Sequence, residues 1–231
     1  MSKSNLEDLQ EILGYRFREP ALLTQALTHS SYANEAGTGH LGSNERLEYL
    51  GDAVLELVSS RFFYDTYPDL PEGRLTTIRA SLVCEPALCD SARAMSLSRY
   101  LLLGKGEEST GGRERPSILS DALEAVIGAV YLDGGYECAR DLILRYVLND
   151  HEQKRSFYDS KTILQEEFQK TGRPAPEYRT ISEEGPDHRK IFTAGVYQDG
   201  TELARGSASS KKHAEQQAAF EALKKLGVVS R

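Results

Sequence analysis

One stretch, residues 44–56, constrains the fold more than any other, because its acidic and its apolar residues both recur at helical spacing. On a helix its carboxylates fall on one face and its leucines and valines on the other; the carboxylates are Glu45, Glu48, Asp52 and Glu56. Such a stripe is usually only the solvated side of an amphipathic helix. Here, however, Glu48 and Asp52 repel each other across one turn, and Gly51 costs about 1 kcal/mol relative to alanine. We therefore expect a cation on the acidic face and another backbone close to Gly51.

A second stretch, residues 120–131, repeats this design. Asp121 and Glu124 share one face, Gly128 lies one turn further along it, and apolar residues fill the opposite face. Two such helices can meet at their glycines, so that four carboxylates converge: Glu48, Asp52, Asp121 and Glu124. Because all four offer hard oxygen ligands and no His or Cys lies near them in sequence, the pattern favours Mg²⁺ or Mn²⁺ over zinc or copper.

These residues resemble the signature of a known family. Residues 44–52, Asn-Glu-Arg-Leu-Glu-Tyr-Leu-Gly-Asp, match eight of the nine signature positions of the ribonuclease III family, and Asp121-x-x-Glu124 is similar to its second acidic motif. The difference is Tyr49, where the family usually has a phenylalanine that enters a socket on a second subunit. The resemblance implies that Tyr49 is a dimer contact, whose hydroxyl needs a hydrogen-bond partner or water. It also implies supporting roles for two further carboxylates, Glu45 and Glu72.

The composition is that of an ordinary soluble protein with one large or two small domains. The chain has 231 residues, of which 39% are hydrophobic and 27% are charged. Because no apolar run approaches the length of a membrane span and the N-terminus lacks the apolar core of a signal peptide, we expect a cytoplasmic protein without membrane contact. The cysteines are odd in number and form no Cys-x-x-Cys pair, which favours reduced thiols over a disulfide or a zinc site.

The charge is unevenly divided along the chain. Residues 1–155 hold 16 Lys and Arg against 24 Asp and Glu, whereas residues 156–231 hold 12 against 11. The acidic first part cannot hold RNA by bulk electrostatics alone. It would need metal ions or a second module to bring phosphates to it.

The pattern of the first part is helical throughout, and no strand pattern appears before residue 175. Besides the two acidic stretches, helical spacing covers residues 6–36, 74–84, 86–96 and 137–148. Residues 104–116 are predicted to form a mobile polar loop, and residues 149–157 a polar linker. His29, at a helix end, is interpreted as a hydrogen-bonded structural group rather than a catalyst.

The second part changes character. A capped helix over residues 159–170 precedes three extended runs, residues 177–182, 190–198 and 201–208, and a closing helix over residues 211–226. Asp199-Gly200 predicts a tight hairpin turn. This α-β-β-β-α order resembles a double-stranded RNA-binding domain, as do Lys161-Thr162-x-Leu164-Gln165-Glu166 and Ser210-Lys211-Lys212-x-Ala214-Glu215.

The second resemblance implies which residues contact RNA. Duplex RNA exposes a wide minor groove with 2′-hydroxyls, which suits short polar side chains of the first helix. Lysines at the N-terminus of the closing helix add their charge to the helix dipole and suit phosphates. The residues implied are Thr162, Gln165, Glu166, Gln169, His188, Ser210, Lys211 and Lys212.

Together the two resemblances imply an all-α nuclease domain over residues 1–155, followed by a small α+β double-stranded RNA-binding domain over residues 156–231. They imply a homodimer that cleaves double-stranded RNA and takes no small-molecule substrate. Glu48, Asp52, Asp121 and Glu124 would be the catalytic residues and would hold Mg²⁺, with Mn²⁺ as an alternative. Cleavage would leave 5′-phosphate and 3′-hydroxyl ends with short 3′ overhangs on ribosomal, messenger and transfer-RNA precursors. The alternative is an inactive duplex-RNA-binding scaffold, which loss of a carboxylate would favour; all four carboxylates are present.

Overall fold

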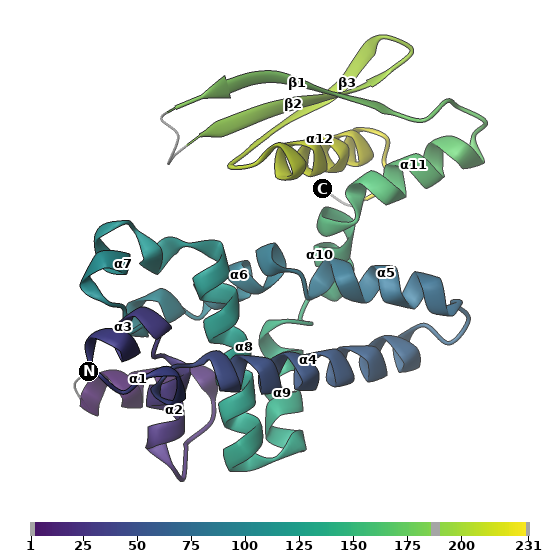
Figure 1. Cartoon of the computed structure of the whole chain (residues 1–231). Coiled ribbons are helices and arrows are strands. Elements are labelled where there is room, and N and C mark those ends of the chain that lie inside the picture. Colours follow the sequence, from purple (N-terminus) through teal and green to yellow (C-terminus); the bar gives the residue numbers. More distant parts are fainter. Residues whose placement is uncertain (1–2, 186–189, 230–231) are drawn as a thin grey trace. The chain divides into compact units, whose positions relative to one another are not determined.

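The computed structural model describes residues 3–185 and 190–229, and its contacts divide the chain into two compact units, Met1–Asn149 and Asp150–Arg231. The first unit is helical, whereas the second combines helices with a three-stranded antiparallel sheet (Figure 1). The predicted fold class is therefore confirmed. None of the helices in the described ranges combines the length and the apolar character that a membrane crossing requires.

Short turns connect the helices of the first unit. Its α-helices are α1 (Lys3–Leu13), α2 (Pro20–Ala26), α3 (Ser30–Glu35), α4 (Glu45–Thr66), α5 (Glu72–Leu82), α6 (Glu85–Ala94), α7 (Lys105–Ser109), α8 (Pro116–Gly134) and α9 (Tyr136–Tyr146). Short 3-10 helices cover His40–Gly42, Leu97–Tyr100 and Gly112–Glu114.

Helix α8 is the central element of this unit. Nearly all of its residues between Ile118 and Val130 are buried, as expected of a helix that is apolar on most sides. It packs along α4 more extensively than any other pair of elements does, and Figure 1 shows the two helices crossing in the middle of the unit. The two acidic stretches of the sequence are thus direct neighbours.

The backbones of α4 and α8 touch at their glycines. A methyl group on Gly51 would lie 1.8 Å from the carbonyl oxygen of Glu124, and one on Gly128 would lie 2.2 Å from the carbonyl oxygen of Leu47. Any larger side chain at either position would push the helices apart. The predicted approach of a second backbone at Gly51 is confirmed.

Residues 104–116, predicted to form a mobile polar loop, include regular secondary structure. They contain α7 and the 3-10 helix Gly112–Glu114, which charged side chains hold in place. The guanidinium of Arg113 donates to the carbonyl oxygens of Ser98 and Leu101 and pairs with Glu108. These contacts reach residues that are distant in sequence, so local composition could not reveal them.

The predicted linker over residues 149–157 is also wrong, because it contains helix α10 (His151–Tyr158), which belongs to the second unit. The ring of Phe157 meets the ring of Phe220 edge-on at 5.3 Å between centroids. The Gln216 side chain donates a 3.0 Å hydrogen bond to the carbonyl oxygen of Phe157. One apolar residue therefore anchors an otherwise polar segment.

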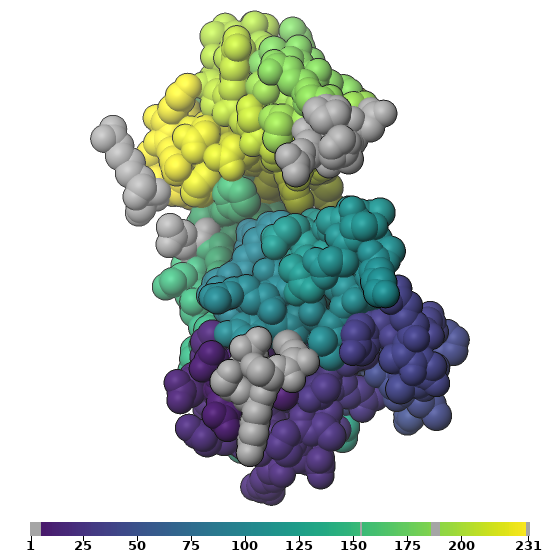
Figure 2. All heavy atoms as spheres, turned by 90° about the vertical axis from the view of Figure 1, so that its left-hand side faces the viewer, coloured from purple at the N-terminus to yellow at the C-terminus, as the bar shows by residue number. Residues whose placement is uncertain are grey.

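The second unit continues with α11 (Ser160–Lys170), β1 (Glu177–Glu184), β2 (Ile191–Gln198), β3 (Thr201–Ala208) and α12 (Lys211–Lys225). The strands lie in the order β1-β2-β3, and Asp199 and Gly200 both adopt positive φ in the hairpin turn. Figure 1 shows α12 along one face of the sheet, where it shares a core with α11 and the strands. In Figure 2 the atoms of this unit, coloured green to yellow, form a compact mass.

Candidate functional site

Three carboxylates converge where α4 and α8 meet. Glu48, Asp121 and Glu124 each offer one oxygen, and these oxygens all lie within 4.8 Å of one another. The contact between Gly51 and the backbone of Glu124 sets this spacing, because it lets the acidic faces of the two helices approach. Oxygen ligands this close together can coordinate one hard divalent cation. We call Glu48, Asp121 and Glu124 the carboxylate cluster.

Asp52 is a neighbour of the carboxylate cluster but is not one of the three residues whose oxygens lie within 4.8 Å of one another. It follows Glu48 by one turn of α4 and is exposed, whereas the cluster residues are partly buried. Its charge nevertheless reaches the cluster and contributes to raising the pKa of both Glu124 and Glu48. Asp52 is therefore placed to contribute a fourth charge at the solvent side.

Burial and mutual repulsion perturb the whole cluster. Burial, followed by the charges of Asp52, Asp121 and Glu48, raises the pKa of Glu124 to about 8. Burial also raises the pKa of Glu48 and of Asp121, and for Glu48 the charge of Asp121 adds to it. Carboxylates in such a site cannot all ionise without a compensating positive charge. The donor set and its electrostatics therefore fit a divalent cation.

For the metal-free protein we expect the free energy of unfolding to fall as the pH rises from about 5 to about 8, where Glu124 titrates in the folded state. In the unfolded chain the pKa of Glu is about 4.3. At pH values between the unfolded and the folded pKa of Glu124, the folded state binds more protons than the unfolded state. Raising the pH therefore favours unfolding. A divalent cation should restore stability at pH 8, because it replaces the proton. Thermal unfolding with EDTA or with Mg²⁺ measures both effects.

The Glu124→Gln variant is the control for this pH dependence. Its amide is neutral at every pH, so the metal-free variant should lose less stability than the wild type between pH 5 and pH 8. Equal losses in the two proteins would contradict the raised pKa of Glu124.

Two other acids of α4 lie outside the cluster. Glu45 accepts a 3.2 Å hydrogen bond from the Ser43 hydroxyl, although its charge contributes to raising the pKa of Glu48. Glu56 pairs at 2.8 Å with Arg79 of α5, which also donates a 2.7 Å hydrogen bond to the Ser60 hydroxyl. The sequence placed Glu56 on the acidic stripe, but a cation on another helix neutralises it.

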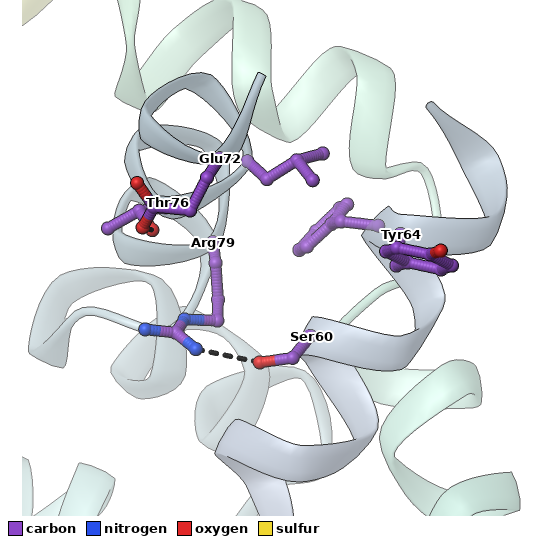
Figure 3. Close-up of a pocket in the computed structure, with 7 residues that line it drawn as sticks. Ser60, Tyr64, Glu72, Thr76 and Arg79 are labelled. Carbon is purple, nitrogen blue, oxygen red and sulfur yellow. Dashed lines mark hydrogen bonds between the residues drawn. The ribbon is translucent and has the colours of Figure 1, made fainter. Parts of the chain in front are cut away.

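Glu72 stands apart from the cluster of its own chain. It lies at the start of α5 and lines a pocket between α4 and α5, together with Ser60, Tyr64 and Arg79 (Figure 3). Its carboxylate accepts a 2.9 Å hydrogen bond from the Thr76 hydroxyl. Ser60 lies roughly 18 Å beyond Glu48 along the axis of α4, at the rise of an α-helix. Glu72 is thus a pocket residue outside the carboxylate cluster.

Glu85 and His29 lie close enough to Asp121 to influence it, although no sequence pattern indicated this. The charge of Glu85 contributes to raising the pKa of Asp121, and His29 opposes that effect. His29 also caps α3, where its Nδ1 accepts a 3.2 Å hydrogen bond from the backbone N–H of Ser31. His29 is thus hydrogen-bonded at a helix end, as predicted. No local spacing connects either residue with Asp121, so only the fold could reveal their proximity.

Of the residues expected to contact RNA, those that the structure describes lie on α11 and at the start of α12. Thr162, Gln165, Glu166 and Gln169 follow helical spacing along one side of α11. Ser210 caps α12 and accepts a 3.3 Å hydrogen bond from the backbone N–H of His213; Lys211 and Lys212 follow it in the exposed first turn. His188 lies outside the described residues.

An exposed apolar stripe runs along α4. Tyr49, Leu57 and Tyr64 lie on one side of the helix, and their exposed fractions are 81%, 59% and 68%. Tyr49 also borders a groove lined by Leu22, Leu50 and Leu132, together with polar residues. Large apolar side chains exposed in a row are typical of a protein interface.

Comparisons with known proteins agree with both units. A family model described as ribonuclease-III-like matches residues 19–151, and one described as a double-stranded RNA binding motif matches residues 160–226. Ribonuclease 3 of Symbiobacterium thermophilum is 50% identical over 216 residues, which cover 92% of this chain and 91% of that protein. Ribonuclease 3 of Pelotomaculum thermopropionicum is 49% identical over 97% of this chain and 94% of its own.

The first unit is also similar to solved structures. The nuclease domain of ribonuclease III from Campylobacter jejuni is 42% identical, with a TM-score of 0.59, over 63% of this chain and 97% of its own. That structure describes flexibility in a region involved in dimer formation. A second structure of the same domain has a TM-score of 0.58.

Proposed function

The chain belongs to the ribonuclease III family of endoribonucleases that act on double-stranded RNA, and we propose that its cleavage depends on Mg²⁺ and leaves 5′-phosphate and 3′-hydroxyl ends. The observation that carries this proposal is the convergence of Glu48, Asp121 and Glu124 within 4.8 Å. Mn²⁺ would bind the same oxygen ligands.

The proposed roles follow from burial and charge. Glu48, Asp121 and Glu124 hold the cation, and Asp52 adds its charge from the solvent side. Burial and the neighbouring carboxylates favour the protonated form of Glu124, and a bound cation would offset their negative charge and favour the ionised form. When bound, Mg²⁺ supplies activation of water and neutralisation of phosphate charge. Glu45 and Glu72 have supporting roles outside the cluster.

The second unit compensates for the acidity of the first. Residues 1–149 carry 22 acidic against 14 basic residues, so duplex RNA needs a separate binding surface. The polar side of α11 suits the minor groove, and Lys211 and Lys212 suit phosphates. Because this recognition reads shape rather than sequence, it suits structured ribosomal, messenger and transfer-RNA precursors.

A duplex RNA cleavage assay tests the proposed chemistry. A labelled duplex should be cut by the purified full chain with Mg²⁺ or Mn²⁺ and stay intact with EDTA, whereas a single strand of the same sequence should not be cut. A 5′-phosphate-dependent exonuclease should degrade the products. Cutting in EDTA, or products that resist the exonuclease, would contradict the proposed chemistry. Binding without cleavage under every condition would favour the inactive scaffold.

The exposed stripe on α4 supports a homodimer with Tyr49 at the contact. Because the two strands of a duplex run in opposite directions, a twofold axis would present one carboxylate cluster to each strand. A dimer would also cover the apolar side chains that one subunit leaves exposed.

Replacing Tyr49 with alanine should weaken the dimer about 30-fold, which corresponds to the roughly 2 kcal/mol of a buried aromatic anchor. Tyr49→Phe keeps the ring and should dimerise at least as well as the wild type. Sedimentation equilibrium over a range of protein concentrations measures both dissociation constants. If Tyr49→Ala dimerised like the wild type, Tyr49 would not be the contact.

A further inference from the structure

A β-bulge brings Glu183 to the face of the sheet that α12 covers. Thr180 pairs with Ala194, which is buried beneath α12. Since side chains alternate along a strand, Glu183 would otherwise lie on the opposite face. The register shifts between Thr180 and Ser182, however, and places Glu183 opposite Phe192, on the same face as Ala194. The extra residue thus turns an acid towards the N-terminus of α12.

Lys211 forms an ion pair with Glu183. Its Nζ lies 2.5 Å from Oε1 of Glu183 and 5.6 Å from the centre of the Phe192 ring. This hydrogen bond holds the pKa of Glu183 below its usual range, so the carboxylate is charged at neutral pH. A residue expected to bind phosphate therefore already binds an anion of its own chain.

A second lysine of this unit, Lys161, forms a less exposed ion pair that serves as a comparison. Lys161 on α11 pairs with Glu215 on α12 and lies 4.4 Å from the centre of the Tyr178 ring. The exposed fractions of Lys161 and Glu215 are 36% and 26%, against 56% and 39% for Lys211 and Glu183. The Lys161 pair joins the two helices, whereas the Lys211 pair lies at the solvent-exposed end of α12. An exposed pair contributes little to stability.

We propose that Glu183 sets the affinity for double-stranded RNA by competing with RNA phosphates for Lys211, an inference that rests on the proposed phosphate contact of Lys211. An RNA phosphate can bind Lys211 only after the lysine leaves Glu183. Glu183 therefore opposes RNA binding as a competitor for Lys211.

Replacing Glu183 with glutamine in the full chain is expected to tighten duplex binding about three- to fivefold, the size of an exposed ion pair. The matched control is Glu184→Gln, which removes the same charge from the next residue. Glu184 is exposed, and strand alternation places it on the face away from Lys211. Binding is measured by titration of a labelled duplex in EDTA, which prevents cleavage, and thermal unfolding checks that each variant is folded.

A double-mutant cycle with Lys211→Ala tests whether the effect passes through Lys211. The loss caused by Lys211→Ala should be about three- to fivefold larger in the Glu183→Gln background than in the wild type. Equal gains for Glu183→Gln and Glu184→Gln, a gain that persists without Lys211, or weaker binding by Glu183→Gln would each overturn the competition. If Lys211→Ala changes binding in neither background, the proposed phosphate contact itself is wrong, which is a separate result.

Discussion

Replacing Glu124 with glutamine is expected to slow cleavage of double-stranded RNA about a thousandfold while leaving duplex binding nearly unchanged. The amide keeps the shape of the side chain but removes one negative charge, and with it a proposed metal ligand, from the carboxylate cluster. Loss of about 4 kcal/mol of charge stabilisation in the transition state gives this factor. The proposed RNA-contacting residues belong to the second unit, so the substitution leaves them unchanged.

Single-turnover cleavage with Mg²⁺ and a binding titration in EDTA measure the two properties separately. Glu56→Gln is the matched control, because Glu56 lies on the same acidic stripe of α4 but pairs with Arg79. Its cleavage rate should stay within a few-fold of the wild type. Glu124→Gln cleaving within tenfold of the wild type would contradict the role of Glu124 as a ligand.

Replacing Gly51 with alanine should destabilise the first unit by on the order of 3 kcal/mol, a typical upper cost of overpacking. The added methyl group would lie 1.8 Å from the carbonyl oxygen of Glu124, and backbone cannot move aside as the end of a flexible side chain can. For a chain of this size the melting temperature should fall by about 6 to 12 °C. Because α4 and α8 must separate, the carboxylate cluster should also widen and cleavage should be lost.

Gly73→Ala provides the control for this substitution. Gly73 lies in α5, and a methyl group there would meet nothing within 4 Å. Alanine should therefore be neutral or stabilise the protein by up to about 1 kcal/mol through its higher helix propensity. Thermal unfolding and duplex cleavage are measured on both variants. A Gly51→Ala protein that melts and cleaves like Gly73→Ala would show that the close helix contact is not required.

Much of the fold could be predicted from local patterns in the sequence. The helical spacing of acids and glycines in residues 44–56 and 120–131 predicted both the meeting of α4 with α8 and the carboxylates between them. Turn chemistry at Asp199-Gly200 predicted the hairpin of the second unit. These features could be read from the sequence because helix periodicity and turn preference depend on residues only a few positions apart.

Contacts between distant residues decided the rest. Arg79 pairs with Glu56 and neutralises its charge. The ring of Phe220 contacts Phe157 and anchors α10, where the polar sequence had predicted a linker. The bulge after Thr180 decides which face of the sheet Glu183 occupies, although an unbroken alternation would place it on the other. The sequence alone thus predicted the fold class and the residue types of the carboxylate cluster. Which carboxylates converge and which are neutralised by cations depended on tertiary packing, because ion pairs, burial and strand register join residues that no local spacing connects.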